Sequence, residues 1–188
     1  AEGDVITNFL ASGLDATISY AAGTGNDVVI TVLNPLNTQV EVTGGNLEIT
    51  DIGGGVAQNL SYSVSGSNLV ITDTSGNRIS LVGGTGTGNG TTTATVPLTD
   101  FTNGTLDVDS GGGDDTHTFD ATFNIATTRG VMLDAGAGSD AVSWNATAQL
   151  ASLNVTAEAI NLNSGTVNTG TGNQTYNGDV TLLANTTL

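Results

Sequence analysis

The chain has 188 residues, with 18 acidic side chains against two basic ones, which gives a formal net charge of −16. This charge repels phosphate backbones and anionic lipid headgroups, so we expect neither nucleic-acid binding nor membrane insertion. The lack of cysteine excludes a disulfide scaffold and thiolate metal sites. Valine, isoleucine and leucine recur throughout, which argues against disorder.

Apolar and polar residues alternate along almost the whole chain. Short alternating runs bounded by Gly, Asn, Asp and Ser are typical of strands joined by turns. Residues 147–160 are the one segment with helical character, but their Thr and Val content favours a strand. We therefore predict an all-β protein with little helix, its strands centred on Ile18 and Tyr20, Val40 and Val42, Leu47 and Ile49, Tyr62 and Val64, Leu69 and Ile71, Ile79 and Leu81, Leu106 and Val108, Val131 and Leu133, Val142 and Trp144, Leu153 and Val155, Ile160 and Leu162, and Val180 and Leu182.

The spacing of these strands favours a right-handed parallel β-helix, or β-solenoid. Leu47 and Leu69 are 22 residues apart, as are Leu133 and Val155. Coils of about 20–25 residues that stack about 4.8 Å apart would bury one continuous apolar column. The alternative is a series of tandem β-sandwich modules, which also use many short strands. The aromatic content of 4% favours the solenoid, since sandwich cores usually hold large aromatic side chains.

The strands continue from end to end, so we expect one solenoid segment over residues 1–188. The low-complexity stretch GGTGTGNGTTTAT at 83–95 is a candidate division into 1–82 and 96–188. Because the sequence begins at Ala1 without Met, we expect it to be a processed or excised piece of a longer protein.

One internal repeat is clear. Residues 108–115 (VDSGGGDD) match residues 133–140 (LDAGAGSD) at an offset of 25, and at the same offset Phe119 falls opposite Trp144. We predict that the two Asp-rich loops lie on adjacent coils, within one or two strand spacings of each other.

The pattern Gly-x-Gly-x-Asp occurs at 23–27, 111–115 and 136–140 and resembles the calcium-binding nonapeptide GGxGxDxUx. Glycines let backbone carbonyls point inward, and Asp supplies the hard oxygen that Ca²⁺ prefers. Two features depart from that pattern: the first Gly is replaced, and the copies are not tandem. The other interpretation is a corner turn whose Asp caps the backbone. Candidate calcium ligands are Asp27, Asp109, Asp114, Asp115, Asp134 and Asp140.

Catalytic chemistry finds little support. His117 is the only histidine, and we expect it at the surface or in a turn rather than as a ligand. No Gly-x-Ser-x-Gly elbow accompanies it, and a lyase base would have to be Arg78 or Arg129. Trp144 is expected in the core or at the edge of a coil, with stacking on a sugar ring as the alternative. We expect no enzyme activity.

Several segments resemble a known class of sequence. Residues 18–32 resemble the closing strands of autotransporter-associated β-strand repeats, and residues 68–81, 96–116 and 173–188 resemble units of giant repeat-rich bacterial surface proteins. The resemblance implies an extracellular or cell-surface segment with a structural or adhesive role and no catalytic residues.

Its partners would be neighbouring repeats of the same chain or other copies, joined end to end, because a solenoid without caps leaves unpaired strand edges. The alternative function is a calcium-dependent carbohydrate-binding module that binds extracellular glycans through its Asp loops and Trp144.

Overall fold

The computed structural model describes residues 3–9, 14–22 and 27–188, and the chain divides into two units, Ala1–Pro35 and Leu36–Leu188. The first unit is a three-stranded antiparallel sheet in the order β1–β2–β3, formed by β1 (Val5–Ile6), β2 (Ala16–Ala22) and β3 (Asp27–Val32). Among the described residues β3 pairs only with β2, so its other edge is open. Val28, Ile30 and Val32 are exposed on this strand.

The all-β prediction is confirmed. The described residues contain no α-helix, and a short 3₁₀ turn, η2 (Leu98–Phe101), is their one helical element. Each alternating pair named from the sequence lies in a strand, including Leu153 and Val155 in β15 (Ser152–Leu162). Strand alternation thus outweighed the helical character of residues 147–160.

Two antiparallel hairpins begin the second unit. The first joins β4 (Leu36–Thr43) to β5 (Asn46–Asp51), and the second joins β6 (Asn59–Ser65) to β7 (Asn68–Asp73). The first turn needs two glycines, because Gly44 and Gly45 have φ angles of 57° and 86°. Positive φ is costly for residues with a Cβ, and two-residue hairpin turns use it to match the twist of the strands.

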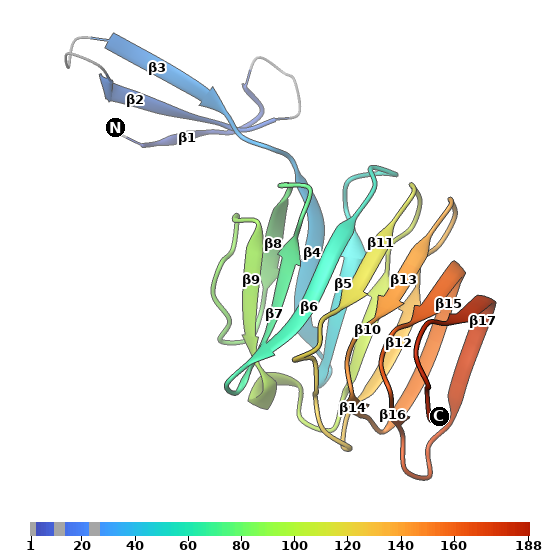
Figure 1. Cartoon of the computed structure of the whole chain (residues 1–188). Helices are drawn as coiled ribbons and strands as arrows, with labels where there is room; N and C mark the ends of the chain where they lie inside the picture. Colours follow the sequence, from blue (N-terminus) through green and yellow to red (C-terminus); the bar gives the residue numbers. More distant parts are fainter. Residues whose placement is uncertain (1–2, 10–13, 23–26) are drawn as a thin grey trace. The chain divides into compact units, whose positions relative to one another are not determined.

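Two further strands bring the ends of the sheet together. β8 (Arg78–Val82) pairs in parallel with β4, and β9 (Thr93–Pro97) pairs antiparallel with β7. An antiparallel bridge joins Ile79 to Thr91, so the twelve-stranded sheet nearly closes on itself (Figure 1). The Gly/Thr-rich stretch at 83–95 lies inside this unit, where Thr87 and Thr95 exchange backbone hydrogen bonds of 2.9 Å.

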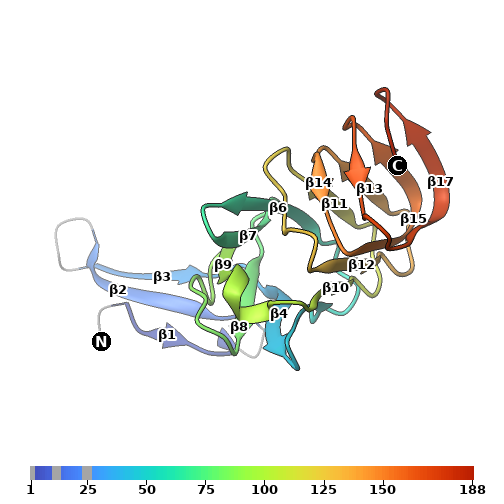
Figure 2. The ribbon, with the colours of Figure 1, turned by 90° about the horizontal axis from the view of Figure 1, so that it is seen from below.

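The remaining strands form successive parallel layers, which Figure 2 shows side by side. The first layer (residues 105–119) pairs on one side with β5 and β6 and on the other with the second layer (130–149), and the third (152–168) and fourth (174–188) follow. Their strands are β10 (Thr105–Asp109), β11 (Thr116–Phe119), β12 (Gly130–Asp134), β13 (Ala141–Trp144), β14 (Ala148–Gln149), β15, β16 (Val167–Asn168) and β17 (Gln174–Leu182).

The pairing limits the β-helix prediction. The four layers pair in parallel, but β4–β5, β6–β7 and β7–β9 are antiparallel, so a right-handed parallel β-helix over residues 1–188 is not confirmed. The reason is the length of the connections. Gly44-Gly45 and Gly66-Ser67 join their strands through two residues, which permits only an antiparallel return.

The core consists of columns of side chains in register across the layers. One column runs Leu47, Leu106, Val131, Leu153, and a second runs Ile49, Val108, Leu133, Val155. All eight side chains are buried. Each buried aliphatic side chain contributes about 1.5–3 kcal/mol relative to exposure, so the columns hold the layers together.

Candidate functional site

The Asp-rich loops after β10 and β12 lie on adjacent layers, as the sequence predicts. Asp109 and Asp134 are register partners, and Gly112 and Ala137 form a parallel bridge. Gly138 permits this close stacking, because a Cβ there would overlap the carbonyl of Gly113.

The acids of these loops cap backbone groups on the neighbouring layer. Asp115 Oδ1 accepts the N–H of Gln58 at 2.5 Å, and Asp140 Oδ1 accepts the N–H of Asp115 at 2.7 Å. Glu158 Oε2 then accepts the N–H of Asp140 at 2.9 Å. The result is a carboxylate ladder, Asp115–Asp140–Glu158, that runs across the layers. The acids thus cap backbone N–H groups, which is the interpretation that the sequence analysis gave as the alternative to calcium binding.

Burial shifts the titration of this ladder. Asp115 and Asp140 are 0% and 1% exposed. Burial raises the pKa of the Asp115 carboxyl to about 6, opposed by the Gln58 N–H and supported by the nearby carboxylates. Burial also raises the pKa of Asp140. The Asp140 N–H, by contrast, lowers the pKa of Glu158. At Asp115 and Asp140 the loss of solvent therefore raises the pKa by more than the single backbone hydrogen bond lowers it.

The other candidate ligands have different surroundings. Asp109 Oδ1 and Asp134 Oδ1 accept the N–H groups of Gly111 and Gly136 at 3.1 Å, each within its own turn. Asp114 Oδ1 accepts the Ser139 N–H at 3.0 Å. Asp27 begins β3, but its side chain and the 23–26 loop lie outside the described residues. The described part of the chain holds no group of three or more His, Cys, Asp or Glu side chains arranged for a metal ion.

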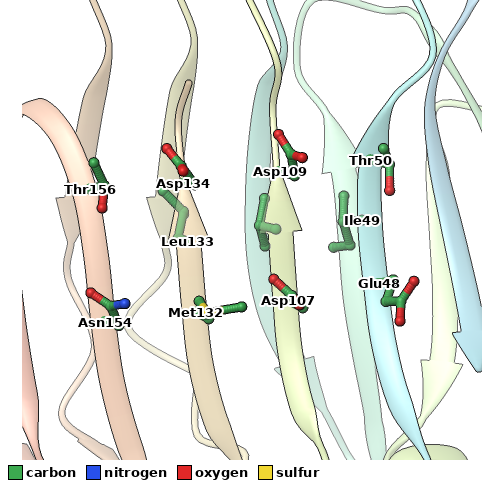
Figure 3. Close-up of a pocket in the computed structure, with 11 residues that line it drawn as sticks. Glu48, Ile49, Thr50, Asp107, Asp109, Met132, Leu133, Asp134, Asn154 and Thr156 are labelled. Atoms are coloured by element: carbon green, nitrogen blue, oxygen red, sulfur yellow. The ribbon is translucent and has the colours of Figure 1, made fainter. Parts of the chain in front are cut away.

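A shallow acidic groove of about 370 Å³ lies on the outer face of β5, β10, β12 and β15 (Figure 3). Glu48 is paired with Asp107, and Asp109 with Asp134. Partial burial, then the charge of Asp109, raises the pKa of Asp107. Like charges on adjacent strands repel, so the groove attracts counter-cations and disfavours anionic partners.

The prediction that His117 lies at the surface or in a turn is wrong. His117 is in β11, is 0% exposed, and occupies the apolar column between Leu60 and Val142. Its Nδ1 and Nε2 lie 2.9 Å from the Tyr62 hydroxyl and 2.8 Å from Ser110 Oγ. Burial lowers the pKa of His117 to about 4, so the ring is neutral at pH 7. With both nitrogens occupied, it is a core residue.

Trp144 lies in the core, so the sugar-stacking interpretation is wrong for this structure. The side chain is 1% exposed, and its Nε1–H donates to the Ala146 carbonyl at 2.9 Å. Its ring lies 4.4 Å from the ring of Phe119, which in turn stacks on Tyr62 at 4.7 Å. The predicted pairing of Phe119 with Trp144 is confirmed. No face of the indole is open to a sugar.

Sequence reasoning missed two residues before position 100 that belong to the same pattern of backbone caps. Asp51 caps Gly53 at 2.6 Å in the way that Asp109 caps Gly111, and Gln58 is the first residue that the ladder caps. A signal was present: residues 51–55 read DIGGG, close to DSGGG at 109–113. The offset of 58 rather than 25 concealed it.

Comparisons of this chain with family models, curated proteins and solved structures found no match. Within the described ranges, no helix is long and apolar enough to cross a membrane.

Proposed function

We propose that this chain is a structural or adhesive β-solenoid segment of a secreted bacterial surface protein or extracellular filament, without catalytic activity. Register offsets of 25, 22 and 21 residues between successive layers, as in Leu106 to Val131, Val131 to Leu153 and Leu153 to Gln174, support a solenoid. The similarity to autotransporter-associated repeats supports an extracellular location. We further propose that residues 105–188 follow the right-handed β-helical path.

The observation that carries this proposal is the open end of the fourth layer. Val180 and Leu182 are register partners of Ile160 and Leu162, which are 1% exposed in the third layer. Yet Val180 and Leu182 are 43% and 56% exposed. The two positions continue core columns, and among the described strands only β15 pairs with the strand that carries them.

The same end has other marks of an unfilled interface. A hollow of about 690 Å³ lies there, lined by Val167, Tyr176 and Leu188 among others. In the part of the chain that the structure describes, β17 pairs only with β15, so its outer backbone groups are available to another strand. An open edge beside exposed apolar side chains is a template for strand addition.

The partner that fits this edge is β3 of a second copy. β3 is also an open edge strand, and its Val28, Ile30 and Val32 repeat every second residue, the same period as Val180 and Leu182. Pairing would cover both apolar rows and would join copies end to end. Backbone hydrogen bonds and apolar contacts need no basic patch, which suits a chain with two cationic side chains.

Light scattering over a concentration series, with electron microscopy of the products, tests this proposal. The wild-type chain should associate into dimers or filaments. Leu182→Asp or Ile30→Asp should keep it monomeric, because each variant puts a charge into the contact. Val82→Asp is the matched control, since Val82 is 40% exposed on β8, outside both β3 and β17, and the substitution adds the same charge. A wild-type monomer at the highest concentration, or equal loss in the control, would contradict the proposal.

A further inference from the structure

The Gly/Thr-rich segment 83–92 connects the two end strands of the twelve-stranded sheet, β8 and β9. A strand at the end of a sheet presents backbone N–H and C=O groups that another strand can bind. The segment contains no strand longer than an isolated bridge, and its bridges join Thr91 to Ile79 and Thr87 to Thr95. Its contacts therefore decide whether this end of the sheet is open to a partner.

The segment occupies the outer edge of β8. The Ile79 N–H donates to the Thr91 carbonyl at 2.7 Å, and the Ile79 carbonyl accepts the Gly90 N–H at 2.8 Å. Two residues further along β8, the Leu81 N–H donates to Asn89 Oδ1 at 2.9 Å. Backbone and side chain of the segment thus take up three groups that a partner strand would need.

The segment occupies the outer edge of β9 in the same way. Thr87 and Thr95 donate their N–H groups to each other's carbonyls, both at 2.9 Å. The Thr93 N–H donates to Thr91 Oγ1 at 3.2 Å. The next position of this alternation is Pro97, which has no N–H to donate. No N–H at positions 93, 95 and 97 is therefore left for another strand.

Glycine at every second position from 84 to 90 lets the segment lie this close. A Cβ at Gly86 would come within 2.7 Å of the Thr95 carbonyl, and a Cβ at Gly88 would overlap the Thr93 carbonyl. These carbonyls belong to the backbone of β9 and cannot yield as a flexible side chain can. Close packing on β9 thus gives a physical reason for the low complexity of this stretch.

The segment is also held near both of its ends. Asp100, in η2, accepts the Thr85 N–H at 2.6 Å and the Thr85 hydroxyl at 3.1 Å. The Thr92 carbonyl accepts the N–H of Asp73, the last residue of β7, at 2.9 Å. The contacts with β8 and β9 lie between these two anchors, so the anchors keep the segment on the edges.

We propose that residues 83–92 are a strap that takes the place of a partner strand and closes this end of the sheet to strand addition. The partner that the strap excludes is an extended strand of a second copy, which would bind the same N–H and C=O groups of β8 and β9. Among the described strands β17 pairs only with β15, so its outer edge stays open. The strap therefore gives the second unit one closed end and one open end.

Hydrogen exchange measured by NMR at single residues tests whether the strap holds the edges. The wild-type amides of Ile79, Leu81 and Thr95 should be protected. Gly88→Ala should accelerate their exchange about tenfold or more, because a displaced strap exposes them without global unfolding. Gly90→Ala is the matched control, since Gly90 also has a positive φ, 75°, but a Cβ there meets nothing within 4 Å. It should have a smaller effect.

The amides of β10, which pairs on both sides, should stay protected in both variants and so separate strap opening from unfolding. A milder pair covers the case in which Gly88→Ala does not fold. Asn89→Ala removes only the acceptor of the Leu81 N–H and should accelerate exchange of that amide, whereas Asn89→Asp keeps an oxygen there and should not.

Light scattering tests the consequence for association, in a Leu182→Asp background that blocks the β17 edge. Adding Gly88→Ala should make the molar mass rise with protein concentration, and adding Gly90→Ala should not. Association of Leu182→Asp alone would contradict the proposed contact at β17, while the exchange data would still decide the role of the strap. Unprotected wild-type amides at Ile79 and Thr95, or identical exchange and molar mass in the two glycine variants, would overturn the proposal.

Discussion

The backbone N–H of Asp115 donates to Oδ1 of Asp140 at 2.7 Å, although the two residues lie 25 positions apart in the chain. That separation equals the offset of the sequence repeat, so the bond joins equivalent positions of adjacent layers. The acid of one layer therefore caps the turn of the layer before it, and the repeat specifies how its own copies stack.

This capping predicts a difference between two substitutions at Asp140. Asp140→Ala removes the acceptor and leaves the buried Asp115 N–H without a partner, so we expect a loss of about 1–3 kcal/mol in the free energy of unfolding. Asp140→Asn keeps an oxygen at that position and should cost less than about 1 kcal/mol. Urea unfolding followed by circular dichroism measures both. If the two variants were equally stable, the hydrogen bond would be of no consequence for the fold.

A glycine pair tests the contact between layers directly. A Cβ at Gly138 would overlap the Gly113 carbonyl, whereas a Cβ at Gly112 would meet the Ala137 carbonyl at an ordinary 3.6 Å. Gly138→Ala should separate the loops and cost more than about 2 kcal/mol, because backbone cannot yield as a side chain can. Gly112→Ala should change the free energy of unfolding by less than about 1 kcal/mol. Comparable losses in both variants would show that the layers tolerate separation here.

Trp144 lies at one end of a row of packed rings, Tyr62–Phe119–Trp144, and should be one of the most important side chains for stability. It is fully packed against Phe119 and Phe123, with ring centroids 4.4 and 5.5 Å away. Trp144→Ala should cost about 3–5 kcal/mol by leaving a cavity. Tryptophan fluorescence is lost in this variant, so far-ultraviolet circular dichroism in urea is the suitable measurement. The control is Met132→Ala in the acidic groove, where the side chain is exposed and little change in the free energy of unfolding is expected.

Replacing His117 alone should destabilise the fold more than replacing it together with its two hydrogen-bond partners. His117→Leu suits the column between Leu60 and Val142 but leaves the Tyr62 hydroxyl and Ser110 Oγ buried without their partner. We expect a loss of about 2–4 kcal/mol. Adding Tyr62→Phe and Ser110→Ala should recover at least half of it, because buried polar groups are then absent. A triple variant no more stable than the single one would show that the cost lies in shape alone.

Alkaline pH should destabilise the protein through the ionisation of Tyr62 and Tyr176. Burial raises the pKa of Tyr176 to about 12 and that of Tyr62 well above its usual value of 10. The folded state therefore holds these protons more tightly than the unfolded state, so the stability they give is complete below pH 10 and falls as pH rises toward 12. Phenolate absorbance should show Tyr176 ionising near pH 12, and Tyr176→Phe should remove that step. A step near pH 10 assigned to Tyr176 would contradict the effect of partial burial on its pKa.

The sequence by itself determined where most of the strands lie and which loops stack, although β9 and β11 were not among the strands it predicted. Alternation marks a strand with one buried face, so Leu106 and Val108 or Leu153 and Val155 could be placed without a structure. The 25-residue repeat fixed the pairing of Asp109 with Asp134 and of Phe119 with Trp144, since copies of one unit stack in register.

Only the tertiary structure decided strand direction and the contents of the corners. Alternation is the same in parallel and antiparallel strands, so it did not separate the hairpins from the coils of a solenoid. The two-residue turns at Gly44-Gly45 and Gly66-Ser67 were the signal in the sequence that indicated hairpins. The burial of His117 depends on Tyr62, which lies 55 residues earlier, and the corner at Asp115 depends on Gln58, 57 residues earlier. Such partners share no period with the repeat. They meet because β6 pairs with β11, which is a property of the folded chain.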